Sequence, residues 1–125
     1  MPRGSIGDDS GANTNPERWL QDNHWNCDEV ELVAAATALA LGAAVAVGAT
    51  RRIREITIRN VGSNNTVVTI TDGTDIKLSI DVPAQTTRVW SSQDGRLFAA
   101  GETPDAQTSD ITGGSTYVSA GGVEA

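Results

Sequence analysis

The sequence alternates apolar and polar residues most regularly between Ile53 and Val82, in three successive runs. In the first run Ile56 and Ile58 share one face, and the opposite face is polar: Glu55, Thr57 and Arg59. In the third run the apolar face consists of Ile76, Leu78, Ile80 and Val82. A period of two in runs rich in β-branched residues predicts the half-buried strands of an antiparallel sheet.

Turn residues separate these runs and the weaker ones that follow. Asp72-Gly73 predicts a hairpin, and Pro83 ends the third run. Further strands are expected over 86–91, 96–99 and 115–119, with a turn at Gln93-Asp94-Gly95 and a loose end at Gly121-Gly122. Turn signals recur at about 8 to 12 residues, which favours an all-β fold. We predict an antiparallel β-sandwich, either jelly-roll or Ig-like, with an extended N-terminal arm.

Residues 32–50 contain no charged side chain, and Arg51 and Arg52 follow at once. The length and the basic flank are typical of a membrane span, but most positions are Ala or Gly and few are bulky. An Ala-rich buried helix is a second alternative, because Ala has the highest helix propensity. Alternation from Val30 onward, and a short apolar run over 44–48, favour two strands that are joined near Gly42.

The first part of the chain has a different composition. Residues 1–28 are poor in aliphatic side chains and rich in Gly, Asn, Asp and Ser. We expect an extended arm over 1–28 and a β-sandwich domain over 29–125. Asn15 as a cap and Pro16 as a first helical position predict a helix of about two turns that ends near Trp25.

Two tryptophans lie in this polar arm, Trp19 and Trp25. A tryptophan buries roughly 150 to 250 Å², so an exposed position is costly. The two side chains either fold back onto the protein's own sheet or anchor the arm to a neighbouring subunit or partner. Our candidate protein interface therefore combines residues of the arm with the basic pair at 51–52. It consists of Trp19, Leu20, His24, Trp25, Arg51 and Arg52.

The net charge of −7 narrows the choice of partners. Nucleic acids and anionic membranes are not expected, because phosphate binding depends on clustered Lys and Arg. The one basic cluster is interpreted as a solvated or subunit-contacting strand face: Arg51, Arg52, Arg54 and Arg59. Cys27 is the single cysteine and cannot form an internal disulfide, so no disulfide scaffold is implied.

No group of residues predicts catalysis. The only histidine, His24, lies in the arm, and the sequence has no Gly-x-Ser-x-Gly segment, so a hydrolytic triad is not expected. Asp72, Asp75 and Asp81 fall at a turn and on a polar strand face, where solvation explains them. His24 and Cys27 are three residues apart, but no second His or Cys completes a zinc site. We expect no enzyme activity, metal, cofactor or small-molecule substrate.

Three stretches carry a resemblance: Ile-Arg-Glu-Ile-Thr-Ile-Arg-Asn-Val-Gly-Ser over 53–63, Asp-Val-Pro-Ala-Gln-Thr over 81–86, and the Gly- and Thr-rich run over 108–122. Together they resemble small β-sandwich structural proteins of tailed bacteriophages, in particular capsid decoration, or cement, proteins. The similarity covers residues 30–125 and is one of style without a diagnostic motif. It implies a protein on the outer capsid surface of the virion, often a homotrimer, that clamps neighbouring copies of the major capsid protein.

Other function classes suit the same fold. A head-tail connector or tail subunit would form rings instead of surface trimers. A carbohydrate- or receptor-binding module would need several exposed aromatic side chains, and only Trp90, Phe98 and Tyr117 are available in the domain. A single-pass membrane protein would depend on residues 32–50 alone.

Overall fold

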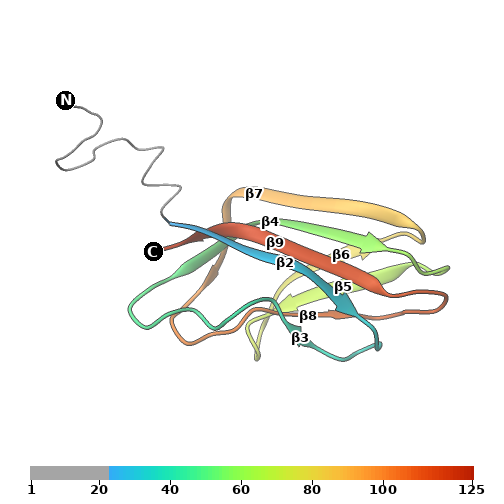
Figure 1. Cartoon of the computed structure of the whole chain (residues 1–125), viewed down its shortest axis with the longest axis horizontal. Helices are drawn as coiled ribbons and strands as arrows, with labels where there is room; N and C mark the ends of the chain where they lie inside the picture. Colours follow the sequence, from blue (N-terminus) through green and yellow to red (C-terminus); the bar gives the residue numbers. More distant parts are fainter. Residues whose placement is uncertain (1–22) are drawn as a thin grey trace.

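The structure is a computed structural model that describes residues 23–125 (Figure 1). These residues form strands and no helix, which confirms the all-β prediction. The strands are β2 (His24–Leu32), β3 (Leu39–Ala40), β4 (Arg51–Asn60), β5 (Thr66–Thr71), β6 (Ile76–Val82), β7 (Thr86–Phe98), β8 (Asp105–Thr108) and β9 (Thr116–Glu124).

The strands pair as the two arms of one long hairpin whose tip is the turn between β5 and β6. β2 pairs with β9, β3 with β8, β4 with β7 and β5 with β6, all antiparallel. Pairings of β9 with β4 and of β8 with β5 complete two sheets, ordered β2-β9-β4-β7 and β3-β8-β5-β6. Figure 1 shows them as two stacked layers. This strand order is that of a jelly roll, one of the two sandwich topologies that the sequence left open.

The core lies between the two sheets and is almost entirely aliphatic. The first sheet contributes the predicted inner face of β4, whereas the second contributes the inner faces of β5, β6 and β8. Phe98, at the end of β7, is the one fully buried aromatic side chain in the described chain. The other main core residues are Leu32, Leu41, Val45, Ile53, Ile56, Ile58, Val68, Ile70, Val82, Ala106 and Val118.

Both ends of β4 place a polar residue in the interior. Arg51 begins the strand and Asn60 ends it, and their exposed fractions are only 2% and 1%. The Asn60 amide donates to the carbonyl oxygens of Asn64 and Val82, and its Oδ1 accepts the N–H of Gly62. Asn60 therefore fastens β4 both to the loop that follows it and to the end of β6.

The hairpin prediction is confirmed, since β5 and β6 are joined at Asp72-Gly73 and β6 ends before Pro83. The predicted turn at 93–95 is wrong, because β7 continues through it. Residues 92–95 form a bulge opposite the single residue Arg54. Gly95 has a φ of +70°, and a Cβ there would lie 2.7 Å from the Ile53 carbonyl oxygen. A bulge and a tight turn both favour glycine at such a position, so the sequence signal is the same.

The loose end predicted at Gly121-Gly122 is also wrong, because β9 runs through both residues to Glu124. β9 lies between β2 and β4, and a Cβ at Gly122 would collide with the Arg52 carbonyl oxygen. Gly122 therefore provides room for close strand packing in the middle of a sheet.

Residues 33–50, which we call the strap, cross one edge of the sandwich from the end of β2 to the start of β4 (Figure 1). The strap contains only the two-residue β3 before Gly42 and no strand after it, so the prediction of two strands joined near Gly42 is wrong. The run over 44–48 is a loop whose Val45 exchanges two backbone hydrogen bonds with Gly101 and Glu102 instead of joining a sheet. No helix among residues 23–125 is long and apolar enough to cross a membrane.

The arm and the sheet meet earlier than the composition indicates. Residues 24–28, which we placed in the arm, form the first half of β2 and pair with β9. Trp25 accordingly lies in a strand and not at the end of a helix. Residues 1–22 lie outside the described residues, and with them most of the predicted short helix.

Candidate interaction surfaces

Arg51 lies at the centre of a buried polar cluster at one end of the sandwich. Its Nη2 is 2.7 Å from Glu124 Oε1, and its Nε donates to the same oxygen at 2.7 Å. Nη1 donates to the Ala43 carbonyl oxygen at 2.8 Å. The guanidinium carbon lies 4.4 Å above the centre of the Trp25 ring. Arg51 thus joins β2, β4, β9 and the strap. Because these contacts bury its side chain, Arg51 is not part of the described protein surface.

Trp25 reaches Arg51 because its neighbour in the sheet has no side chain. Trp25 pairs with Gly122, and Gly122 in turn pairs with Ile53, so no β9 side chain stands beside the indole where it extends from β2 towards β4. The indole also lies under the strap, where a Cβ at Gly42 would be 3.4 Å from its Cζ2. Of the two alternatives left open for Trp25, the structure gives the intramolecular one, since the ring packs against the core.

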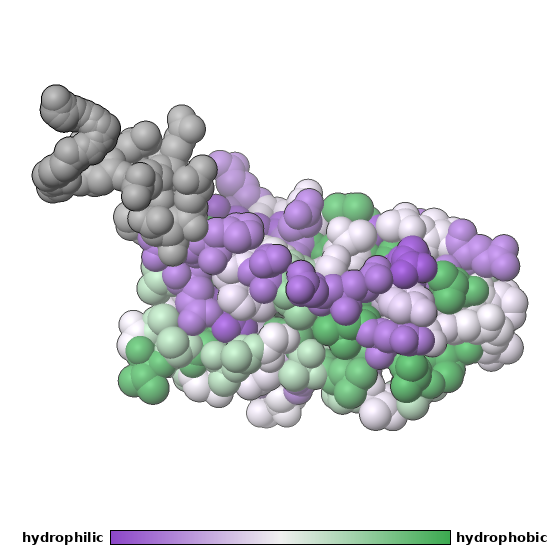
Figure 2. All heavy atoms as spheres, in the orientation of Figure 1, coloured by the Kyte–Doolittle hydropathy of each residue, from purple (hydrophilic) through white to green (hydrophobic). Residues whose placement is uncertain are grey.

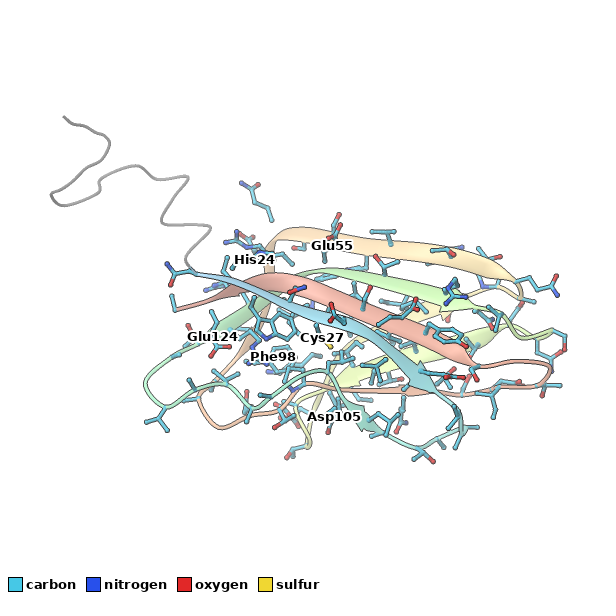
Figure 3. The ribbon with its side chains drawn as sticks, in the orientation of Figure 1. His24, Cys27, Glu55, Phe98, Asp105 and Glu124 are labelled. Carbon is cyan, nitrogen blue, oxygen red and sulfur yellow. The ribbon has the colours of Figure 1, made fainter. Side chains whose placement is uncertain are left out.

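Glu124 supplies the carboxylate of this cluster and was not recognised from the sequence. Burial raises its pKa, but the Ala46 N–H and the Arg51 guanidinium hydrogen-bond the charged form, and the net pKa is lowered. Glu124 also fixes the start of β2, because its N–H donates to the Asn23 carbonyl oxygen at 2.9 Å. Figure 3 shows Glu124 at the end of the sandwich where β2 begins.

His24 and Arg52 lie on the opposite, outer face of the first sheet. Both pair with Val123, which places them in one lateral row across β2, β9 and β4. Both are exposed, and Arg52 Nη1 donates to the Asp94 carbonyl oxygen of β7 at 3.1 Å. Trp19 and Leu20 lie outside the described residues. The predicted interface set therefore divides into a buried pair and an exposed pair on opposite faces of the sheet.

A groove of about 390 Å³ lies on this outer face between β2, β9 and β4. Its polar lining includes three carboxylates (Asp28, Glu29, Glu55) and His24 but no Lys or Arg, so the carboxylates would repel an anion there. Among residues 23–125, no three His, Cys, Asp or Glu side chains gather as metal ligands. The groove is therefore a shallow polar depression without a recognisable chemical site.

The side chains of Cys27 and His24 point to opposite faces of β2. Its side chain is buried on the inner face of β2, whereas His24 is exposed (Figure 3). Burial and the nearby Asp28 carboxylate raise the pKa of the Cys27 thiol, and Arg51 opposes them only in part. A buried thiol with a raised pKa is a poor nucleophile, so this environment does not activate Cys27.

No aromatic side chain in the described part of the chain is exposed enough to act as a stacking platform. Phe98 is fully buried, Trp90 is half-buried beneath the Arg96 guanidinium, and Tyr117 lies beneath Arg59. Glycan-binding faces stack sugars on open aromatic rings. The described residues provide no such face.

The strap presents an uncharged, largely apolar surface. Val47 is 99% exposed and Val33 is 59% exposed, and most alanines between them are exposed as well. Figure 2 shows hydrophobic residues along the lower edge of the view, over β3 and its flanks, and hydrophilic residues over β2, β9 and β4. The absence of charge over 32–50 is visible in the sequence, but the alternation predicted two strands there and not an exposed loop.

No protein-family model matches the sequence, and no curated protein matches it.

Proposed function

We propose that this protein is a non-enzymatic structural protein of a tailed-phage virion, which decorates the outer capsid surface and bridges neighbouring copies of the major capsid protein. The observation that carries the proposal is a jelly roll whose described surface offers an ordered apolar strap but no assembled catalytic or metal-binding group. Such a surface is suited to protein contact, not to chemistry on a small molecule.

The topology adds support at the level of fold. Jelly rolls recur in viral capsid proteins, and also in lectins and cupins, so the fold alone does not decide the function. The sugar-binding alternative loses support because the aromatic rings of the described domain are covered by its own arginines or buried. The cupin type of enzyme usually needs a metal, for which residues 23–125 bring together no ligand set.

The buried polar residues at the two ends of β4 favour a mechanical role for the protein. Arg51 and Asn60 tie strands to loops at opposite ends of β4, so the sandwich is fastened at both ends. A clamp that bridges capsid subunits must resist deformation, and a scaffold whose buried Arg51 and Asn60 are hydrogen-bonded suits that task. In many copies, modest individual contacts add up to strong attachment.

A head-tail connector or tail subunit is the second candidate. The same fold and surface would serve it, and the two roles differ in copy number and position. Decoration of the shell requires many copies spread over the capsid, whereas a connector or tail ring requires one ring or a stack of rings.

The experiment is quantitative mass spectrometry of purified virions of the phage that encodes this protein, combined with cryo-electron microscopy of the same particles. We expect a copy number comparable to that of the major capsid protein and density on the outer shell. A copy number limited to one ring, with density at the portal or tail, would favour the connector. Absence from intact virions would overturn the structural role.

A further inference from the structure

The strap presents an apolar surface that the fold holds in place. Three of its exposed side chains are large and apolar, with exposed fractions of 99% for Val47, 59% for Val33 and 38% for Leu39. None of the 18 residues of the strap is charged. Exposed apolar surface of this kind often marks a contact site, because leaving it in water is unfavourable.

The strap is not a loose loop. Leu41 and Val45 insert into the core, and their N–H groups donate to the carbonyl oxygens of Pro104 and Glu102. The Ala36 N–H donates to Thr108, and the Arg51 guanidinium holds the Ala43 carbonyl oxygen. The exposed side chains are therefore ordered before any partner arrives, which lowers the entropic cost of docking.

The chemistry of the strap restricts its occupant. Without Lys or Arg it has no attraction for nucleic acid or lipid phosphates. Most of its side chains are a methyl group or a hydrogen atom, so the surface has low relief and no aromatic anchor. The strap surface is complementary to another protein surface that is also flat, uncharged and composed of small side chains.

We propose that copies of this chain associate through their straps, with the strap of a second copy as the occupant. Two chains of net charge −7 repel each other. Strap-to-strap contact brings the uncharged edges together and keeps the charged outer faces of β2, β9 and β4 apart (Figure 2). This inference concerns the free protein and does not rest on the proposed capsid role.

The size of the strap sets the expected strength of association. A standard interface uses about 20 to 30 residues from each partner. The strap has 18 residues, of which Leu41 and Val45 are buried in the core, so it falls below that range and weak, concentration-dependent association is expected. Because the contact is apolar and the chains repel, added NaCl should strengthen association, whereas a contact between charged edges would weaken with salt.

The test is sedimentation equilibrium of the full chain over a wide concentration range, at low and high NaCl. We compare the wild type with Val47→Asp and Val33→Asp, and we use Val89→Asp as the matched control. Val89 is 60% exposed on β7, so its replacement adds the same charge at an equally exposed valine outside the strap. Circular dichroism and thermal unfolding establish that each variant folds.

We expect the wild type and Val89→Asp to associate with rising concentration, more strongly at high NaCl. Either strap variant should weaken association at least about tenfold, because a carboxylate would be desolvated in an apolar contact. A wild type that stays at the mass of one chain overturns the proposal. So do strap variants that associate like the wild type, and so does an equal loss in Val89→Asp.

Discussion

Trp25 and Arg51 lie face to face, with the guanidinium carbon 4.4 Å from the centre of the indole ring. The pair joins two strands that are not adjacent in the sheet, since β9 separates β2 from β4. Gly122, the β9 residue that pairs with Trp25, has no side chain, so the indole can extend across β9 towards β4. A residue from the polar first part of the chain is in this way built into the core, and its ring covers a buried charge.

Replacing Arg51 tests how much this cluster contributes. Arg51→Ala leaves the Glu124 carboxylate and the Ala43 carbonyl without their partner, and we expect the free energy of unfolding to fall by about 3 to 5 kcal/mol. Arg51→Lys should recover only part of this, because an ammonium group cannot reproduce the fork of donors. Urea denaturation gives the values. Arg52→Ala is the exposed control, with an expected loss below about 1 kcal/mol; equal losses at both positions would contradict the assignment.

The lowered pKa of Glu124 makes stability depend on pH. The folded-state pKa lies below the ordinary value, so the carboxylate stabilises the fold above that value of 4.5. This contribution should be lost as the pH falls below 4.5 and through the folded-state pKa. Glu124→Gln should be less stable than the wild type at neutral pH, with a smaller decline on acidification. Asp72 and Asp110, whose pKa values are also lowered by backbone N–H groups, add to the decline in both proteins. Parallel pH profiles would show that Glu124 is not linked to folding.

Two adjacent glycines in β9 should respond differently to the same substitution. Gly122→Ala places a methyl group against the Arg52 carbonyl oxygen in the middle of the sheet, so we expect a large loss of stability or failure to fold. At Gly121 the nearest atom to an added Cβ would be 3.8 Å away, an ordinary contact. Gly121→Ala should therefore keep its melting temperature within a few degrees. If Gly122→Ala behaves the same way, the packing described for β9 is incorrect.

Asn60 fixes the other end of β4. Asn60→Ala leaves buried carbonyl oxygens and the Gly62 N–H without partners, and we expect a loss of more than about 2 kcal/mol in denaturant unfolding. Asn65 offers a matched control, because its Oδ1 also accepts one loop N–H, from Ala84, but the residue is exposed. Asn65→Ala should cost less than about 1 kcal/mol, since water replaces the lost bond.

The boundary of the arm can be tested by truncation. Deleting residues 1–28 removes Trp25 and the first half of β2, including its pairs with β9, so that protein should be strongly destabilised or fail to fold. Deleting residues 1–22 keeps every contact described for residues 23–125 and should leave thermal unfolding close to that of the full chain. Only the shorter deletion is suitable for measuring what the arm contributes to binding. Equal stability of the two truncated proteins would contradict the role of Trp25.

The sequence predicted the part of the fold in which side-chain alternation is continuous. Ile56 and Ile58 are buried as expected, and the Asp72-Gly73 hairpin forms. The bulge opposite Arg54 was missed because its Gly95 gives the same signal as a turn. The spacing of three between Ile53 and Ile56 was the available clue, since a continuous strand would keep a spacing of two.

The interaction surfaces were harder to predict, because they depend on contacts between distant residues. Arg51 is predicted on a solvated or subunit-contacting strand face as part of the basic cluster, and nothing in its local sequence indicates a partner at Glu124. The strap was uncertain because alanine suits helices, strand interiors and ordered loops alike. Its loop structure is set by backbone bonds to residues 101–108, which no local pattern reveals.

The position of β9 bears on how the chain folds. It is a central strand of the first sheet, yet it is the last of the described strands in sequence, and its pairing with β2 joins His24 to Val123. The second sheet needs nothing beyond β8, whereas the first must wait for β9 to leave the ribosome. Until then β2 and β4 have unpaired edges, which are prone to pair with other chains. Such distant pairing also predicts slow folding, so a chaperone or rapid assembly would benefit this protein most during the interval before β9 inserts.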